Sequence, residues 1–88
     1  MPDRRVMIQN KLGLHARASA RFAATAGAYG CDVHIIKEGI EVNGKSIMGI
    51  LLLAAPKGTL ISIAADGSDE ELAMNNLAEL IEDGFGED

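Results

Sequence analysis

The 88-residue sequence predicts an α+β domain in which a four-stranded antiparallel sheet is covered on one face by three helices. Segments that alternate in the manner of strands are interleaved with segments of helical spacing, in the order β-α-β-β-α-β-α. The two middle strands follow one another without a crossover segment, which favours antiparallel pairing. A chain of this length buries only about 60 to 65% of its unfolded surface, so we expect one core and a single domain, residues 1–88.

The first half of the chain supplies a strand and a long helix. Arg4 to Gln9 alternates, with Val6 and Ile8 on one side, which is typical of a half-buried strand. Ala16 to Ala28 is rich in alanine, contains no proline and stops near Gly30. This composition predicts a helix with a glycine terminator.

A hairpin and a short helix follow. Asp32 to Lys37 and Ile40 to Val42 are β-branched runs joined by Glu38-Gly39, which predicts a hairpin. Ser46 to Ala54 has helical spacing with apolar residues on two faces. A short surface helix rarely needs both faces apolar, so one face is a candidate docking surface.

The last strand and the last helix complete the domain. Leu60 to Ala65 alternates as a strand does, after a turn at Pro56-Lys57-Gly58. Ser68-Asp69-Glu70-Glu71 has the pattern of a capping box, which predicts a helix from about Asp69 to Gly84. The apolar residues that this helix is expected to bury are Leu72, Leu77, Leu80 and Ile81.

Charge is distributed unevenly along the chain. The formal net charge is -5, yet nine of the thirteen acidic residues lie in residues 66–88, which contain no Lys or Arg. Residues 1–65 carry eight basic residues against four acidic ones and are net positive. Such blocks steer partner proteins. Nucleic acid is not an expected partner, because an acidic chain with three aromatic residues lacks a base-stacking platform.

Several features favour a cytoplasmic protein that does not insert into a membrane. Residues 1–5 hold charge and proline and have no apolar stretch of the kind a secretory signal carries. The longest apolar run, Ile47 to Pro56, is about half of the roughly 20 residues needed to cross a bilayer. Cys31 is alone and forms no internal disulfide. No Cys/His pairs suit a structural zinc, and we expect no metal and no cofactor.

His15 is the candidate reactive residue. It follows the turn Lys11-Leu12-Gly13-Leu14 and opens the first helix, where backbone N–H groups lack intrahelical acceptors and attract an anion. A neutral imidazole keeps a free lone pair for attack on phosphorus. Arg17, two residues on, would bind phosphoryl oxygens through its guanidinium fork. The alternative from residue chemistry alone is that both are ordinary solvated residues beside a helix.

Three segments carry a resemblance to a known family. They are Gly13-Leu14-His15-Ala16-Arg17-Ala18-Ser19, Asn43-Gly44-Lys45-Ser46-Ile47-Met48-Gly49 and Ala54-Ala55-Pro56-Lys57-Gly58. In order and spacing, the chain resembles HPr, the histidine phosphocarrier of the bacterial phosphoenolpyruvate-dependent phosphotransferase system. The resemblance implies an open-faced α+β sandwich and a relay without turnover of its own. It also implies that His15 takes a phosphoryl group on Nδ1 from enzyme I and passes it to an enzyme IIA domain, with Arg17 steadying the phosphate.

Ser46 has two expected roles. Its position predicts the N-cap of the second helix. The resemblance further implies that Ser46 is phosphorylated by an ATP-dependent HPr kinase/phosphorylase, whose added charge would repel a partner docking beside His15.

One residue departs from the family pattern, and the end of the chain leaves the branch of the family open. Ala18 stands where the family commonly has proline, which would stiffen the first helical turn. The ending Gly84-Phe85-Gly86-Glu87-Asp88 resembles the nitrogen-related branch, whose role is regulatory. Whether the acceptor serves sugar import or nitrogen signalling is therefore not decided by the sequence.

A basic and apolar surface beside His15 is expected to bind acidic partner proteins. Its predicted members are Arg17, Arg21, Phe22, Ile47, Met48 and Leu52. An alternative function, a regulatory binding protein that carries no phosphoryl group and is switched by phosphorylation, would use the same surface. The small size and relay role favour a monomer.

A nucleotide-binding function is the remaining alternative. Residues 39–46 satisfy the P-loop pattern G-x-x-x-x-G-K-[ST]. Ile40, Glu41 and Val42 within it are typical of a strand, and the chain is too short for a P-loop domain with its parallel sheet. We interpret the match as chance. His34, between Val33 and Ile35, is predicted to be a half-exposed structural residue.

Overall fold

The computed structural model describes residues 3–86, so the N-terminal pair Met1-Pro2 and the acidic pair Glu87-Asp88 lie outside the described residues. Within the described range, four antiparallel strands form one sheet in the order β1-β4-β2-β3, accompanied by three α-helices and one 3-10 turn. The elements are β1 (Asp3–Met7), α1 (Ala16–Gly27), β2 (Asp32–Lys37), β3 (Ile40–Asn43), α2 (Ile47–Leu52), β4 (Leu60–Asp66), α3 (Glu70–Glu82) and η1 (Gly84–Gly86). The predicted fold class and element order are confirmed.

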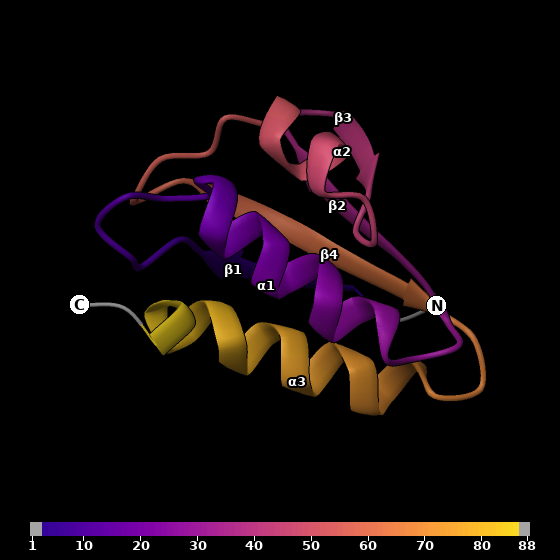
Figure 1. The fold of residues 1–88 in the computed structure, drawn as a ribbon. Coiled ribbons are helices and arrows are strands. Elements are labelled where there is room, and N and C mark those ends of the chain that lie inside the picture. Colours follow the sequence, from indigo (N-terminus) through magenta and orange to yellow (C-terminus); the bar gives the residue numbers. More distant parts are fainter. Residues whose placement is uncertain (1–2, 87–88) are drawn as a thin grey trace.

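The helices cover one face of the sheet. Figure 1 shows α1 and α3 side by side in front of the strands, with α2 beyond the other side of α1. Apolar side chains of the strands, such as Val6, Ile35 and Ile63, are buried beneath them. Burial of this apolar surface is the main stabilising contribution to such a fold.

α1 buries one stripe of its surface. Its buried residues recur at helical spacing and are Ala18, Ser19, Phe22, Ala23 and Ala26. Phe22 is fully buried in the core. The prediction that Phe22 lies on the docking surface is therefore wrong, because its place in this stripe directs the ring inward.

The start of α3 differs from the predicted capping box. Asp69 is the N-cap residue, but its carboxylate accepts hydrogen bonds from the backbone N–H groups of Gly30, at 2.8 Å, and Cys31, at 3.0 Å. These bonds, that from Gly30 first, lower the pKa of Asp69. Burial, followed by the neighbouring Asp69 carboxylate, raises the pKa of the Cys31 thiol. Asp69 thus joins the start of β2 to the start of α3.

The buried face of α3 also differs in part from the prediction. Leu77 and Ile81 are fully buried and Leu80 is half-buried, as expected. Leu72 is 59% exposed, so its predicted burial is wrong. Ala73, its neighbour, takes the buried position instead, together with Leu77 and Ile81.

The hairpin between β2 and β3 has the predicted turn. Glu38 and Gly39 both have positive φ, at 50° and 81°, as a two-residue type I′ turn requires. The following strand pairs Ile40 with Lys37 and Val42 with Ile35. This part of the P-loop pattern is therefore an extended strand, as the sequence indicates.

α2 is shorter than the predicted Ser46 to Ala54 and ends in a strained residue. Its C-cap is Leu53, and Ala54 follows with a φ of 48°. The Ala54 N–H donates to the carbonyl of Leu51 at 3.1 Å. This left-handed position after a helix is usually occupied by glycine, since a Cβ is disfavoured there.

We expect Ala54→Gly to raise the free energy of unfolding by about 0.5–1 kcal/mol, because it removes left-handed strain that exceeds the entropy gained by the unfolded chain. The matched control is Ala24→Gly, at an exposed position inside α1, which should lower the free energy of unfolding by about 0.5–1 kcal/mol. Urea unfolding of both variants measures the two changes. A loss of stability in Ala54→Gly equal to that in the control would contradict the assignment of strain to Ala54.

Candidate functional site

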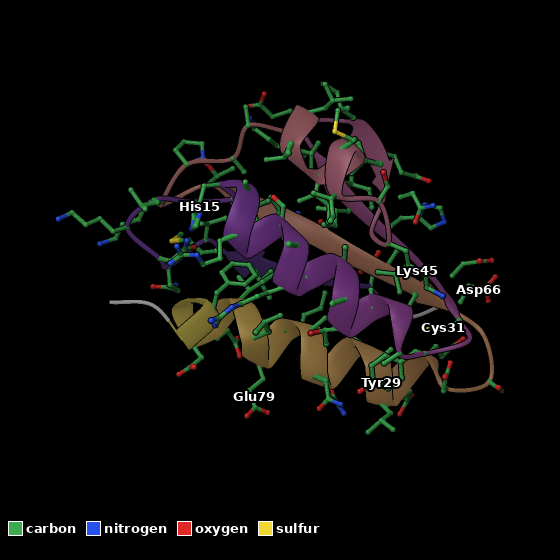
Figure 2. The ribbon with its side chains drawn as sticks, in the orientation of Figure 1. His15, Tyr29, Cys31, Lys45, Asp66 and Glu79 are labelled. Carbon is green, nitrogen blue, oxygen red and sulfur yellow. The ribbon has the colours of Figure 1, made fainter. Side chains whose placement is uncertain are left out.

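His15 is the N-cap residue of α1. Its backbone is extended, with φ -74° and ψ 180°, and its carbonyl accepts the first intrahelical bond from the Ser19 N–H at 2.9 Å. Its side chain takes the place of the usual cap hydroxyl or carboxylate, because Nδ1 accepts a hydrogen bond from the Arg17 N–H at 3.3 Å. Figure 2 shows His15 at the N-terminal end of α1, at the opposite end of the molecule from Tyr29, Cys31 and Lys45.

The cap bond defines the chemistry of the ring. A nitrogen that accepts a hydrogen bond carries a lone pair, so the proton of the neutral imidazole is on Nε2. Nδ1 of His15 is therefore the ring nitrogen that carries the lone pair, and it faces the amide of Arg17. An anionic group attached to Nδ1 would meet the N–H groups of the first helical turn, where the helix dipole favours negative charge.

Gly13 allows the loop before His15 to approach a second loop. It has a φ of 68°, and a Cβ on it would lie 2.4 Å from the Ala55 carbonyl oxygen and 2.8 Å from Cα of Pro56. Leu14 donates its N–H to that same Ala55 oxygen at 2.9 Å. Only glycine fits this position, and the contact holds the segment preceding His15 against residues 54–56.

Two polar side chains are buried among residues 3–86, and both bind this loop. Asn10 donates from Nδ2 to the carbonyl of Gly13 at 2.6 Å, and Ser19 donates from Oγ to the carbonyl of Leu14 at 3.1 Å. The sequence analysis missed both. The available signal for Ser19 was its place in the buried alanine stripe of α1, four residues after His15.

His15 borders an open, basic surface depression. Its lining residues are Lys11, Leu12, His15, Ala16, Arg17, Arg21 and Gly86. Arg21 Nη1 donates to the carbonyl of Phe85, whose ring is buried and whose φ is 59°. The sequence placed Arg21 beside His15 but did not indicate that η1 at the C-terminal end of the described chain borders the same site. Three cationic side chains around one imidazole suit an anionic group.

The remaining residues predicted for the docking surface are exposed. Ile47, Met48 and Leu52 of α2 are 43%, 70% and 79% exposed, and Arg17 and Arg21 of α1 are exposed as well. α2 packs against α1 (Figure 1), so the two sets belong to adjoining elements. Phe22 alone is excluded from this surface by its burial.

Ser46 is the N-cap of α2, as predicted. Its Oγ accepts a hydrogen bond from the Gly49 N–H at 3.1 Å, and the residue is half-buried. Met48 and Leu52, on the same helix, are exposed. A charge added to Ser46 would therefore sit beside the apolar part of the predicted docking surface.

The other sequence candidates have structural roles. Lys45 of the P-loop pattern donates from Nζ to the carbonyl of Tyr29 at 2.8 Å, and its loop directly follows strand β3. His34 is half-exposed on β2, and its Nδ1 lies 3.2 Å from Glu41 Oε2 on β3. Residues 3–86 contain no cluster of three or more side chains suited to hold a metal ion. No helix within this range is long and apolar enough to cross a membrane.

The two histidines are expected to differ in the protonation of Nδ1. His15 Nδ1 accepts a hydrogen bond, so its neutral ring should be the Nε2–H tautomer, whereas His34 Nδ1 faces a carboxylate and should carry a proton. Long-range ¹H–¹⁵N spectra of the imidazoles, recorded at a pH where His15 is neutral, distinguish the two forms. Finding the Nδ1–H tautomer at His15 would contradict the cap bond, with His34 as the internal reference.

Comparison with known proteins matches these observations to one family. The family model described as "PTS HPr component phosphorylation site" matches residues 2–83. The chain is 52% identical over 82 residues to phosphocarrier protein HPr of Neisseria meningitidis serogroup A, covering 93% of this chain and 92% of that protein. It is 47% identical over 88 residues to phosphocarrier protein HPr of Xylella fastidiosa strain 9a5c, covering 100% and 99%.

A solved structure of an HPr protein has nearly the same fold as this chain. The crystal structure of HPr-C-His from Thermoanaerobacter tengcongensis has a TM-score of 0.96 and 42% sequence identity, covering 100% of this chain and 99% of that one. With a basic, anion-attracting site at a helix-capping histidine and with these matches over nearly its whole length, the chain belongs to the HPr family of phosphocarrier proteins of the phosphotransferase system.

Proposed function

We propose that His15 is the residue of this phosphocarrier that takes a phosphoryl group from enzyme I and transfers it to an enzyme IIA domain. The observation that carries the proposal is the position of His15 Nδ1, which faces the first-turn amide of Arg17 at an open, basic depression. An open site suits a relay, because both the donor protein and the acceptor protein must reach the same nitrogen. The protein itself has no turnover: it is phosphorylated once and dephosphorylated once in each cycle.

The first transfer forms one bond and breaks one bond. The Nδ1 lone pair of His15 attacks the phosphorus of the phosphorylated donor protein, and the bond from phosphorus to the donor atom breaks with its electron pair. The proton on Nε2 stays on the ring throughout. In the second transfer the nucleophile of the acceptor attacks the same phosphorus, and Nδ1 leaves with the electron pair that it had supplied.

The groups around His15 would hold the phosphoryl oxygens during both steps. When Nδ1 is phosphorylated, it no longer accepts the Arg17 N–H, and that amide is released to donate to a phosphoryl oxygen. The guanidinium of Arg17 lines the same depression and adds a bidentate donor. Donors that point at the phosphoryl oxygens stabilise negative charge where it develops.

We expect the wild-type protein to gain one phosphate when it is incubated with phosphoenolpyruvate, Mg²⁺ and a bacterial enzyme I, and His15→Ala to gain none. The chain offers a matched control in His34→Ala, which should be phosphorylated like wild type, because His34 lies on β2, away from the helix terminus. Intact mass spectrometry measures the mass gain. The phosphate should be acid-labile and base-stable, as a phosphoramidate is.

The absence of a mass gain in wild type with its cognate enzyme I would overturn the relay. The regulatory alternative, a binding protein that carries no phosphoryl group, would then become the better account. A mass gain that persists in His15→Ala and disappears in His34→Ala would show that His34 is the phosphorylated residue, and it would contradict the proposal.

We also propose that the exposed residues Arg17, Arg21, Ile47, Met48 and Leu52 form the partner-docking surface, and that Ser46 phosphorylation by an HPr kinase/phosphorylase weakens docking. The surface combines cations with apolar side chains, which suits acidic partner proteins. A phosphate at the N-cap of α2 places negative charge where such partners approach.

Met48→Asp and Ser46→Asp should each weaken enzyme I binding about tenfold, the effect of losing a moderate contact at the centre of an interface. Met7→Asp is the matched control, because Met7 is 46% exposed but lies on β1, outside the proposed surface. Calorimetric titration of each variant with enzyme I measures the affinities. Equal weakening of enzyme I binding by Met7→Asp would show that the added charge acts regardless of its position. Wild-type affinity in both Met48→Asp and Ser46→Asp would contradict the proposed docking surface.

A further inference from the structure

We infer that Asn10 and Ser19 are positioning residues for phosphoryl transfer, because together they hold the two consecutive carbonyls that precede His15. The inference rests on the proposed role of His15 as the phosphorylated residue. Neither side chain lines the surface depression, so neither would touch the phosphoryl group. Their effect would act through the backbone that carries the imidazole.

Asn10 binds the first of the two carbonyls. It is 1% exposed, and its Nδ2 donates to the Gly13 oxygen at 2.6 Å. The same oxygen accepts the N–H of His15 at 2.9 Å, and the Asn10 carbonyl accepts the N–H of Gly13 at 3.1 Å. Asn10 therefore closes a tight turn whose last residue is directly hydrogen-bonded to His15.

Ser19 binds the second carbonyl. It is fully buried, and its Oγ donates to the Leu14 oxygen at 3.1 Å. Its backbone N–H donates to the His15 oxygen at 2.9 Å. Ser19 thus binds the carbonyls of Leu14 and His15, one on each side of the His15 Cα. Because Ser19 is a buried residue of α1, both carbonyls are fixed relative to this helix.

The peptide planes before His15 are consequently held from both sides. Asn10 orients the plane between Gly13 and Leu14, and Ser19 orients the plane between Leu14 and His15. The Leu14 N–H is bound to Ala55 as well. These planes set the direction of the imidazole and hence the 3.3 Å contact between Nδ1 and the Arg17 amide.

Burial explains why polar residues at these places have a specific effect. A buried donor must find its acceptor, and an apolar residue would leave the Gly13 and Leu14 carbonyls without these bonds. A misplacement of about 1 Å at a reacting group costs roughly 100-fold in rate. Loss of one of these hydrogen bonds should displace the imidazole by less than this, so the rate of phosphoryl transfer should fall by less than about 100-fold.

The test uses the full-length protein as the substrate of enzyme I, with Ser19→Ala, Asn10→Ala and the double variant. Ser19→Ala is the mildest change, because it removes only the hydroxyl from a site that already lies in a stripe of alanines. We expect kcat for phosphorylation to fall about tenfold in each single variant, with KM within about twofold of wild type, because the docking surface is intact. The neutral imidazole of His15 should also lose part of its Nε2–H tautomer signature.

A matched control separates positioning from general stability. Ile81→Val removes one methylene from the fully buried face of α3, an element that includes neither the loop before His15 nor the first turn of α1. It should lower the unfolding temperature without changing kcat or the tautomer of His15. If it lowers kcat as much as Ser19→Ala does, the effect belongs to stability and the inference is overturned.

Failure of this inference is distinguishable from failure of the proposed function. If wild type is phosphorylated on His15 and Ser19→Ala has the same kcat and the same tautomer signal, positioning by Ser19 is excluded while the relay stands. If wild type is not phosphorylated on His15, the proposed function fails first. Should Asn10→Ala not fold, Ser19→Ala alone decides the question.

Discussion

The hydrogen bond from the Arg17 amide to Nδ1 of His15 is the interaction on which the rest of the site depends. A helix needs acceptors for its first amides, and this chain supplies one from the side chain that is proposed to react. The cap requirement keeps the imidazole over the helix terminus and keeps a lone pair on Nδ1. If His15 is phosphorylated as proposed, we expect the same amide to donate to a phosphoryl oxygen and the positive end of the helix dipole to stabilise the added negative charge.

The surrounding fold is arranged to maintain this geometry. Gly13 lets the preceding loop lie against Ala55, and buried Asn10 and Ser19 hold the carbonyls of Gly13 and Leu14. Phe22, two turns into α1, anchors the helix in the core. Nδ1 of His15, the nitrogen proposed to react, therefore lies at an open surface on a rigid element, and a relay that meets two different proteins needs both features.

Local patterns predicted the order and type of the helices and strands well, and they placed His15 at the N-terminus of α1. The start of α1 at Ala16 followed from composition, and the turn at Glu38-Gly39 followed from hairpin chemistry. Tertiary contacts account for the failures. The carboxylate of Asp69 accepts hydrogen bonds from the backbone just before β2 and does not cap its own helix. On the same helix, Ala73 faces the core and Leu72 is exposed. The alanine stripe of α1 could have indicated that Ser19 is buried, but only the packing of the loop shows that its hydroxyl binds the carbonyl of Leu14.

The first-turn amides of α1 are proposed to bind the phosphoryl group once it is attached to Nδ1 of His15. The most direct test is a ¹H–¹⁵N spectrum of the backbone before and after phosphorylation by enzyme I. We expect the Arg17 amide proton to move strongly downfield on phosphorylation, because it would form a short hydrogen bond to a phosphoryl oxygen, while the amide shifts of β3 stay unchanged. An Arg17 amide whose shift is the same in both states would contradict this proposal.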